Sequence, residues 1–370
     1  MRTIRHLIYG EVIRAVAFVM LAFLALFFFF DLVDQLDDVA RYAKAGYTLP
    51  YALLYVALLI PSHVYELLPI AVLIGTIYVM ARLAESSEFT ILRTSGLGPR
   101  RALTTLLALG VGFVALTFVF GDYLTPEANR TAQLLRTRFW GELSVGQTGA
   151  WLKDRQPQAS YSVNVGAMSA DGAMSNVRIF EFDDQGRLLA TIKAGKATFG
   201  HNNAWELKDV KQRQFGEGTA AGERPEISSK SLAEMSWPTQ LSNDMVAAAL
   251  LSPDRMKTVD LFQYIRHLQT NGQSAQRYEI EFWRKVFYPL SCLVMMVLAL
   301  PFAYLHFRAG NITGYVFLGV LVGISFFLLN NVFGFVGNLR NWEPWLTAAA
   351  PGFLYSLLSL AAFGWLVLRQ

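Results

Sequence analysis

The stretch LLPIAVLIGTIYVMARLAESSEFTILRTSG, residues 67–96, decides the fold because it joins a long apolar run to a short polar segment. The apolar part belongs to a run over 61–81, and about 20 such residues cross a hydrocarbon core of about 30 Å. Charged residues return only after this run, at Arg82, Glu85 and Glu88. The stretch therefore predicts a membrane span followed by a segment at the membrane surface.

Five further apolar runs have a similar length. The 370 residues are 54% hydrophobic and 16% charged, whereas soluble domains carry about 25% charged residues. The expected spans are 12–30, 61–81, 102–121, 286–305, 312–337 and 344–368. The first is too long to be the apolar core of a cleaved signal peptide, and no cleavage pattern follows it. Its one charge, Arg14, is expected to snorkel rather than to line an ion path.

Orientation follows the distribution of lysine and arginine in the short loops. Most of these residues fall on the side of the N-terminus, and few on the other side. The first side holds Arg2, Arg5, Arg82, Arg93, Arg100, Arg101, Arg308 and Arg369, and the second holds Arg41, Lys44 and Arg340. We expect both termini in the cytoplasm and the long insert, about 122–285, in the periplasm of a bacterial cell.

The insert has the composition of a separate domain. VRIFEF (177–182) and RLLATI (187–192) flank the turn DDQG, and Trp205 and Leu207 share one face of a later strand. We expect an all-β domain over 148–250, as a sandwich, jelly roll or open barrel. Helical connectors over 123–147 and 251–285 separate it from the membrane parts, 1–122 and 286–370. The second connector should bury Leu261, Tyr264, Ile265 and Leu268 and stop at Gly272.

Enzyme and cofactor motifs are missing from the sequence. There is no GxxxxGK[ST] loop, no HExxH, no GxSxG and a single cysteine, Cys292. The net charge of +4 includes no long basic run, so a nucleic-acid partner is not expected. His63 and Glu66 stand one helical turn apart in the second span. They fit a proton relay, half of a metal site, or an interfacial pair that water reaches.

Basic residues gather near the expected periplasmic membrane face, at one predicted depth. They are Arg41, Lys44, Arg130, Arg136, Arg138, Arg277, Arg284 and Lys285. Cations at this depth pair with lipid phosphates, which predicts an anionic lipid partner. The alternative is a set of solvated charges, and the acidic run Asp31, Asp34, Asp37 and Asp38 opposes anion binding locally.

Residues 87–95 predict a short cytoplasmic helix. Ser87 suits an N-cap, Glu88 the first turn and Gly96 a stop. Phe89 and Leu92 share a face, and Arg93 falls in the last turn. A plain connector needs neither caps nor apolar residues. We therefore interpret the segment as a docking helix for a separate ATPase, since the chain lacks a phosphate loop of its own.

Several of these stretches resemble the lipopolysaccharide export permeases, the YjgP/YjgQ or LptF/LptG family, and the LptG branch more than LptF. The matching stretches are LVDQL (32–36), residues 67–96, GDYLTPEANRTAQ (121–133), GAWLKD (149–154) and LFQYIRHLQTNGQSAQRYEIEFWRKVFYPLSCLVMMVLALPF (261–302). The resemblance covers essentially the whole chain and is most specific in the second and the last of these stretches.

The resemblance implies a transport complex. Such permeases pair with a paralogous LptF-like permease, an LptB-like cytoplasmic ATPase dimer that uses ATP and Mg, a bitopic LptC-like protein and an LptA-like periplasmic bridge. They take lipopolysaccharide from the outer leaflet of the inner membrane. The family's coupling glutamate matches Glu88, and its phosphate-binding cations match Lys44 and Arg136 best. Asp31 stands where relatives carry a lysine, so Arg41 is expected to substitute for it.

We therefore predict a six-span, 3+3 helical membrane protein with an inserted periplasmic all-β, jelly-roll-like domain. It would serve as a transport subunit that binds no cofactor and has no nucleotide site. The predicted ATPase-coupling residues are Ser87, Glu88, Phe89, Leu92, Arg93 and Gly96. The predicted phosphate-binding residues are Arg41, Lys44, Arg136, Arg138, Arg284 and Lys285. The alternatives are an LptF-type paralogue, a membrane enzyme acting on a lipid through His63 and Glu66, and a permease that transmits motion without carrying lipid.

Overall fold

The computed structural model of the chain describes residues 2–140, 149–156, 159–169, 172–200, 204–216, 227–242, 245–246, 249, 253–304 and 312–368. The chain forms two compact units. The helical unit comprises 1–40, 49–129 and 276–370, and the second unit comprises 41–48 and 130–275.

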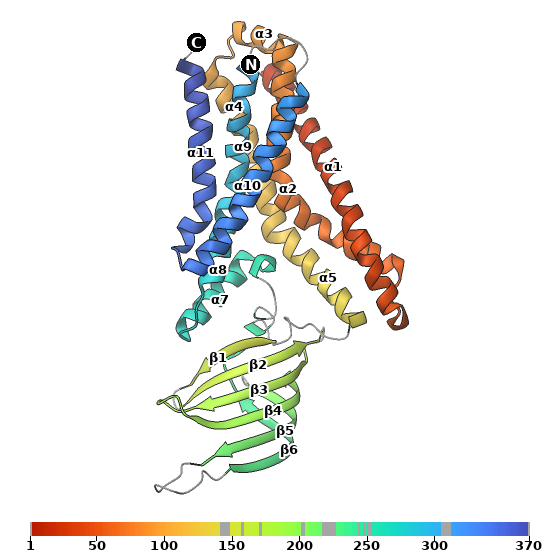
Figure 1. The fold of residues 1–370 in the computed structure, drawn as a ribbon, viewed down its shortest axis with the longest axis vertical. Helices are drawn as coiled ribbons and strands as arrows, with labels where there is room; N and C mark the ends of the chain where they lie inside the picture. Colours follow the sequence, from red (N-terminus) through yellow and green to blue (C-terminus); the bar gives the residue numbers. More distant parts are fainter. Residues whose placement is uncertain are drawn as a thin grey trace. The chain divides into compact units, whose positions relative to one another are not determined.

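Among the described residues, six helical segments are long and apolar enough to cross a membrane, which confirms the six predicted spans. The helices that form them are α1 (Arg2–Tyr42), α2 (Leu49–Glu85), α4 (Pro99–Val119), α8 (Gln276–Phe287), α9 (Ser291–Ala299), α10 (Ile312–Arg340) and α11 (Pro344–Leu368). Helices α8 and α9 together make the fourth span. Both chain ends and the short helix α3 (Glu88–Thr94) lie at the same end of the helical unit (Figure 1).

Helix α2 forms the centre of the helical unit. Buried residues make up 83% of its most apolar window, against 11% for α1 and 17% for α10. A helix that is apolar on all sides is expected to be surrounded by others. Helix α1 crosses it at Gly75, where an added Cβ would lie 2.8 Å from the backbone nitrogen of Val16. Helix α2 begins at Leu49, twelve residues before the predicted start of this span at Pro61. The reason is that Pro61 lies inside the helix and does not begin it.

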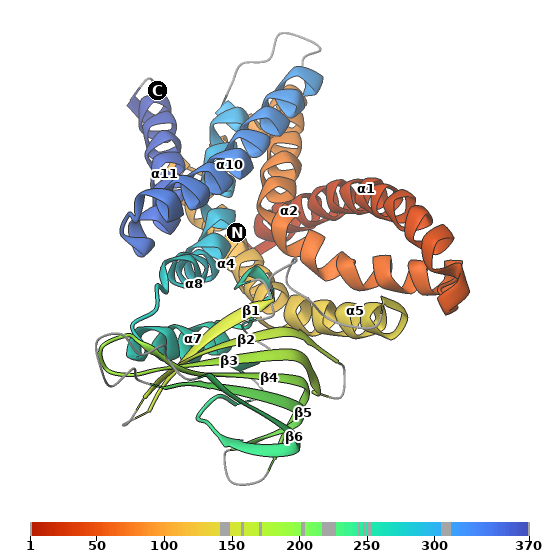
Figure 2. The same ribbon diagram turned by 60° about the horizontal axis from the view of Figure 1, so that its bottom comes forward.

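The second unit is built on one antiparallel sheet, which agrees with the predicted all-β domain. Its strands lie side by side in sequence order (Figure 2). They are β1 (Ala150–Arg155), β2 (Ser160–Met168), β3 (Met174–Phe182), β4 (Leu188–Phe199), β5 (Ala204–Phe215) and β6 (Ile227–Pro238). Trp205 and Leu207 are both buried in the apolar cluster on one face, as their alternation predicts.

The first edge of this sheet is covered by the chain that follows α7 (Thr258–Thr270). The backbone N–H of Lys153 donates to Gln273 and that of Arg155 donates to Asn271, at 3.3 and 3.2 Å. These bonds occupy donors that an open strand edge would leave free. The buried residues of α7 are the four predicted from the sequence, Leu261, Tyr264, Ile265 and Leu268. Gly272 follows with a φ of 63°, as expected for a helix stop.

Candidate functional site

Helix α3 begins without a side-chain cap. Ser87 occupies the N-cap position, as predicted, but its φ of 59° is left-handed and its side chain makes no capping hydrogen bond. A capping side chain requires an extended backbone at the N-cap residue. The short connection from α2 instead holds Ser87 in the left-handed conformation. Glu88 lies in the first turn, where the helix dipole favours a negative charge.

The end of α3 is well defined. Gly96 has a φ of 101°. Its N–H donates to the Arg93 carbonyl and the Leu97 N–H donates to the Leu92 carbonyl, both at 3.0 Å. This pair of bonds is the Schellman arrangement, which needs a left-handed residue and favours glycine. Leu92 and Leu97 belong to the same apolar cluster. The helix therefore ends where the sequence predicts.

One face of α3 is fixed to the chain's own helical unit. The side chain of Phe89 is 2% exposed, and its ring packs edge-on against Tyr304, with 5.0 Å between centroids. The guanidinium of Arg93 lies 5.2 Å from the centre of the same ring, within the range of a cation–π contact. Leu92 packs against the same cluster. Phe89 and Leu92 therefore anchor α3 from within and do not form its outward surface.

The outward face of α3 carries Glu88 and Ile91. Glu88 is exposed, and Ile91 is 63% exposed. Ile91 was not among the predicted coupling residues, because docking was assigned to the face that Phe89 and Leu92 share. The spacing of residues along a helix would have identified Ile91. Residue 91 is two positions from 89, so the two side chains point to opposite faces of the helix.

His63 pairs with a residue of α1. Its Nε2 lies 2.6 Å from Oδ2 of Asp31, and both side chains are largely buried. The ring of Phe27 lies 5.0 Å from that of His63. Of the predicted His63 and Glu66 pair, His63 thus reaches across to α1, and the backbone carbonyl of Glu66 accepts a hydrogen bond from the Tyr288 hydroxyl. Across the described residues, no three His, Cys, Asp or Glu side chains are grouped to hold a metal.

Three of the predicted phosphate-binding cations, Arg41, Lys44 and Arg136, belong to the second unit. Arg41 and Lys44 are exposed at the end of α1 and in the turn that follows. Tyr47, next in this turn, packs against Phe139 of α5 (Thr125–Trp140) at 5.3 Å between ring centroids. The exposed Arg136 lies one helical turn earlier on α5. The side chain of Arg138 lies outside the described residues.

The remaining two predicted cations lie on α8 and have partners within the protein. Arg284 contacts Glu281 at 3.3 Å and Asn331 at 3.5 Å. Lys285 is 5% exposed, and its ammonium donates to the Gly121 carbonyl at 3.1 Å. Gly121 lies in the π-helical turn Phe120–Leu124, whose wider winding displaces carbonyls from the usual ladder. Lys285 is therefore not placed to bind a phosphate, which corrects the prediction.

Comparison with known proteins gives a consistent result. The family described as lipopolysaccharide export system permease LptF/LptG matches residues 6–367. The lipopolysaccharide export system permease protein LptG of Escherichia coli K12 is 26% identical over 342 residues, covering 92% of this chain and 91% of that protein. The LptG protein of Haemophilus influenzae is 26% identical over 341 residues, covering 91% and 90%.

Proposed function

Since the chain belongs to the LptF/LptG family of lipopolysaccharide export permeases, and is a multi-pass inner-membrane protein, we propose that it is the LptG-type subunit of an ABC-type transporter. A separate ATPase dimer, using ATP and Mg, drives it to extract lipopolysaccharide from the outer leaflet. The complex also contains an LptF-like permease, an LptC-like bitopic protein and an LptA-like bridge toward the outer membrane.

The outward face of α3 is the observation that carries this proposal. A seven-residue helix is marginal alone, yet α3 is anchored from within by Phe89 and Arg93 and ended by Gly96. Glu88 and Ile91 are thereby presented on a fixed support. A carboxylate beside an apolar side chain suits a groove on a second protein, because the apolar contact gives affinity and the charge gives register. The ATPase docks here, on the cytoplasmic side with both chain termini.

Lipid phosphates bind at Arg41, Lys44 and Arg136. These three side chains are exposed, and guanidinium and ammonium groups near a membrane face bind lipid phosphates. The β domain, in the periplasm, receives the acyl chains. Asp31 does not take part in phosphate binding, because it is paired with His63. Movement of α3 by the ATPase shifts the spans and expels the lipid toward the sheet.

Charge reversal at Glu88 tests the proposal. In the reconstituted complex, Glu88→Lys should lower lipopolysaccharide-stimulated ATP hydrolysis and lipid release several-fold, because a cation would occupy the place of a partner-facing carboxylate. The melting temperature should not change, because the side chain is exposed. Glu85→Lys is the matched control, an exposed carboxylate at the end of α2. Equal activity of the Glu88→Lys variant and the parent protein would rule out coupling through this face.

A further inference from the structure

The sheet of the second unit carries an exposed tryptophan on the face opposite its apolar cluster, called here the polar face. Successive side chains of a strand point to opposite faces. Ala150 and Leu152 belong to the apolar cluster, so Trp151 lies on the polar face. It is 51% exposed, and its ring stacks on that of Phe180 with 5.8 Å between centroids and 24° between planes. Packing of the core therefore does not account for the tryptophan of GAWLKD (149–154).

A row of side chains crosses the polar face from this tryptophan. In the strand register, Trp151 faces Asn164, Asn164 faces Arg178, and the row continues to Lys193 and Lys211. The strands that carry these residues lie side by side (Figure 2). Neighbouring strands are about 4.8 Å apart, so four such steps make the row about 19 Å long. The row leads from an aromatic platform to three exposed cations.

These three cations repel one another. Arg178 lies directly opposite Lys193, which lies directly opposite Lys211. Like charges in such cross-strand pairs destabilise a sheet. Within the described part of the chain, none of the three belongs to an ion pair. The arrangement costs stability until an anion binds to it.

Two carboxylates of β5 and β6 leave this charge in place. Glu234 pairs with Lys208 at 3.2 Å. The carboxylate of Asp209 lies beside Gly195, 3.5 Å from the place that a Cβ would take there. Among the described residues, Asp209 forms no ion pair with the row. The cations of the row thus keep their donors for a ligand.

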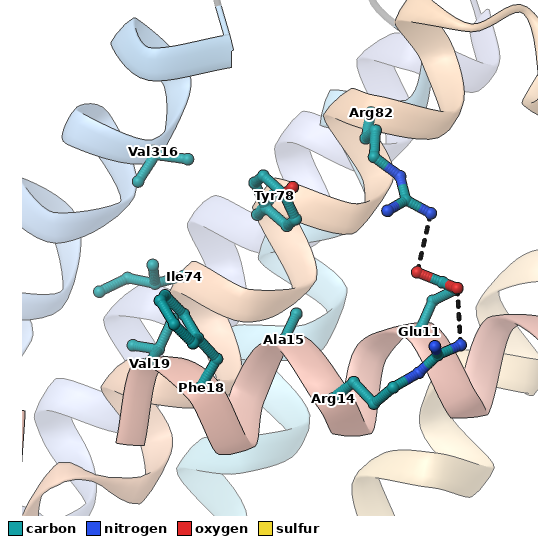
Figure 3. A pocket seen from close by; sticks show the side chains of 9 residues that line it. All are labelled: Glu11, Arg14, Ala15, Phe18, Val19, Ile74, Tyr78, Arg82 and Val316. Atoms are coloured by element: carbon teal, nitrogen blue, oxygen red, sulfur yellow. Dashed lines mark hydrogen bonds and ion pairs between the residues drawn. The ribbon is translucent and has the colours of Figure 1, made fainter. Parts of the chain in front are cut away.

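The helical unit treats neighbouring cations differently. Arg14 of α1 and Arg82 of α2 share the carboxylate of Glu11, each at 2.7 Å (Figure 3). There the protein supplies the counter-charge from its own chain, as expected for cations that serve the fold. The row on the sheet lacks such a counter-charge, which points to an anion from outside the chain.

We propose that this row binds the phosphorylated saccharide of the exported lipid. A sugar ring packs its apolar C–H face on Trp151. Phosphate groups take the donors of Arg178, Lys193 and Lys211, and arginine binds phosphate bidentately. A protein partner fits less well, because protein interfaces have an apolar centre, and here a single aromatic platform stands at the end of a polar row.

The inference rests on the proposed function and adds a second half to it. Acyl chains are assigned to the β domain, and the apolar cluster lies on the face opposite the row. The pleat places Ala150 on the one face and Trp151 on the other. The two halves of an amphipathic lipid therefore meet opposite faces of the same sheet, with the start of β1 between them.

The test measures binding of a soluble probe by the full chain together with the subunits that copurify with it. The probe is the fluorescently labelled oligosaccharide of lipopolysaccharide after removal of its acyl chains, and binding is followed by anisotropy. Lys193→Gln should weaken binding about tenfold, the factor expected for loss of a hydrogen bond to a charged group. Trp151→Ala should weaken it several-fold. A phosphatase-treated probe should still respond to Trp151→Ala and no longer to Lys193→Gln.

Lys230→Gln is the matched control. Lys230 is exposed and faces Gln212, two residues from the pair of Leu232 and Val210, whose Val210 belongs to the apolar cluster. It therefore lies on the other face of the same sheet, and its loss should leave binding unchanged. Equal weakening by Lys230→Gln and Lys193→Gln would mean general attraction of a polyanion to a basic domain, and would overturn the site.

Two further outcomes separate this site from the coupling at α3. Glu88→Lys should leave binding of the probe unchanged, because binding requires no ATP hydrolysis. Full binding by both Trp151→Ala and Lys193→Gln would overturn the site even where Glu88→Lys abolishes export. Tighter binding of soluble cell-wall glycan than of the probe would overturn the choice of ligand. The melting temperature of Lys193→Gln should not fall, since the substitution removes a repulsion.

Discussion

Replacement of Phe89 by alanine should release α3 from the helical unit while the spans stay folded. The ring is 2% exposed and packs on Tyr304. Deletion of a buried phenylalanine ring costs about 3–5 kcal/mol, and an aromatic pair adds about 0.5–1.5 kcal/mol. Even the lower limit of about 3 kcal/mol is about a hundredfold in the local opening equilibrium. The loss falls on α3, because most of the apolar core of the unit lies on other helices.

Hydrogen exchange of the α3 amides measures this opening directly. In Phe89→Ala these amides should exchange about a hundredfold faster than in the parent protein. Amides that are protected less than a hundredfold in the parent should exchange at the unprotected rate, while the amides of α2 and α9 keep their protection. Ile91→Ala is the matched control, because Ile91 is 63% exposed on the same helix and a surface substitution changes stability by about 0.5 kcal/mol or less. Unchanged α3 protection in Phe89→Ala would refute the internal anchor. Equal loosening in both variants would mean that the helix is held by propensity alone.

Two further predictions concern the rest of the fold. Gly75→Ala should destabilise the helical unit by about 1–3 kcal/mol, because the added methyl would meet the Val16 backbone at 2.8 Å. Gly112→Ala, which meets nothing within 4 Å, should be neutral or stabilising in thermal melts. Burial lowers the pKa of His267, and the charge of Asp154 opposes this effect. The folded state then binds fewer protons than the unfolded state, so α7 should be most protected above about pH 6.5 and lose protection as pH falls. Hydrogen exchange of the α7 amides, measured from about pH 5 to pH 8, should show this loss of protection at low pH in the parent protein. The His267→Gln variant should not show it.

Features with a local cause could be predicted from the sequence. The spans follow from apolar length alone. The buried face of α7 follows from the spacing of Leu261, Tyr264, Ile265 and Leu268, and it is the face observed. The stop of α3 follows from Gly96, because only the conformation of that residue and the two bonds after it are involved. Each of these features depends on residues within a few positions of one another.

Features that depend on distant partners could not be predicted in this way. His63 meets Asp31 of α1, and this contact is set by the crossing of two helices and not by helix periodicity. Lys285 looked like a membrane-surface cation, yet it is buried against the π-helical turn at Gly121. Phe89 looked like a docking residue, and its partner, Tyr304, is more than 200 positions away. In each case the side chain has the expected character, and only the tertiary structure shows what it contacts.

The fourth span, 276–304, makes a contact toward each end of the helical unit. At one end, Tyr304 contacts both Phe89 and Arg93 of α3. Toward the other end, Lys285 donates to Gly121 in the π-helical turn that joins α4 to α5. A packed core resists continuous deformation, and π-helical turns are frequent at functional sites. Under the proposed function, displacement of α3 by an ATPase would therefore reach this turn through the fourth span. The contact between Lys285 and Gly121 is then better understood as part of the coupling between the two membrane faces than as part of a lipid-binding surface.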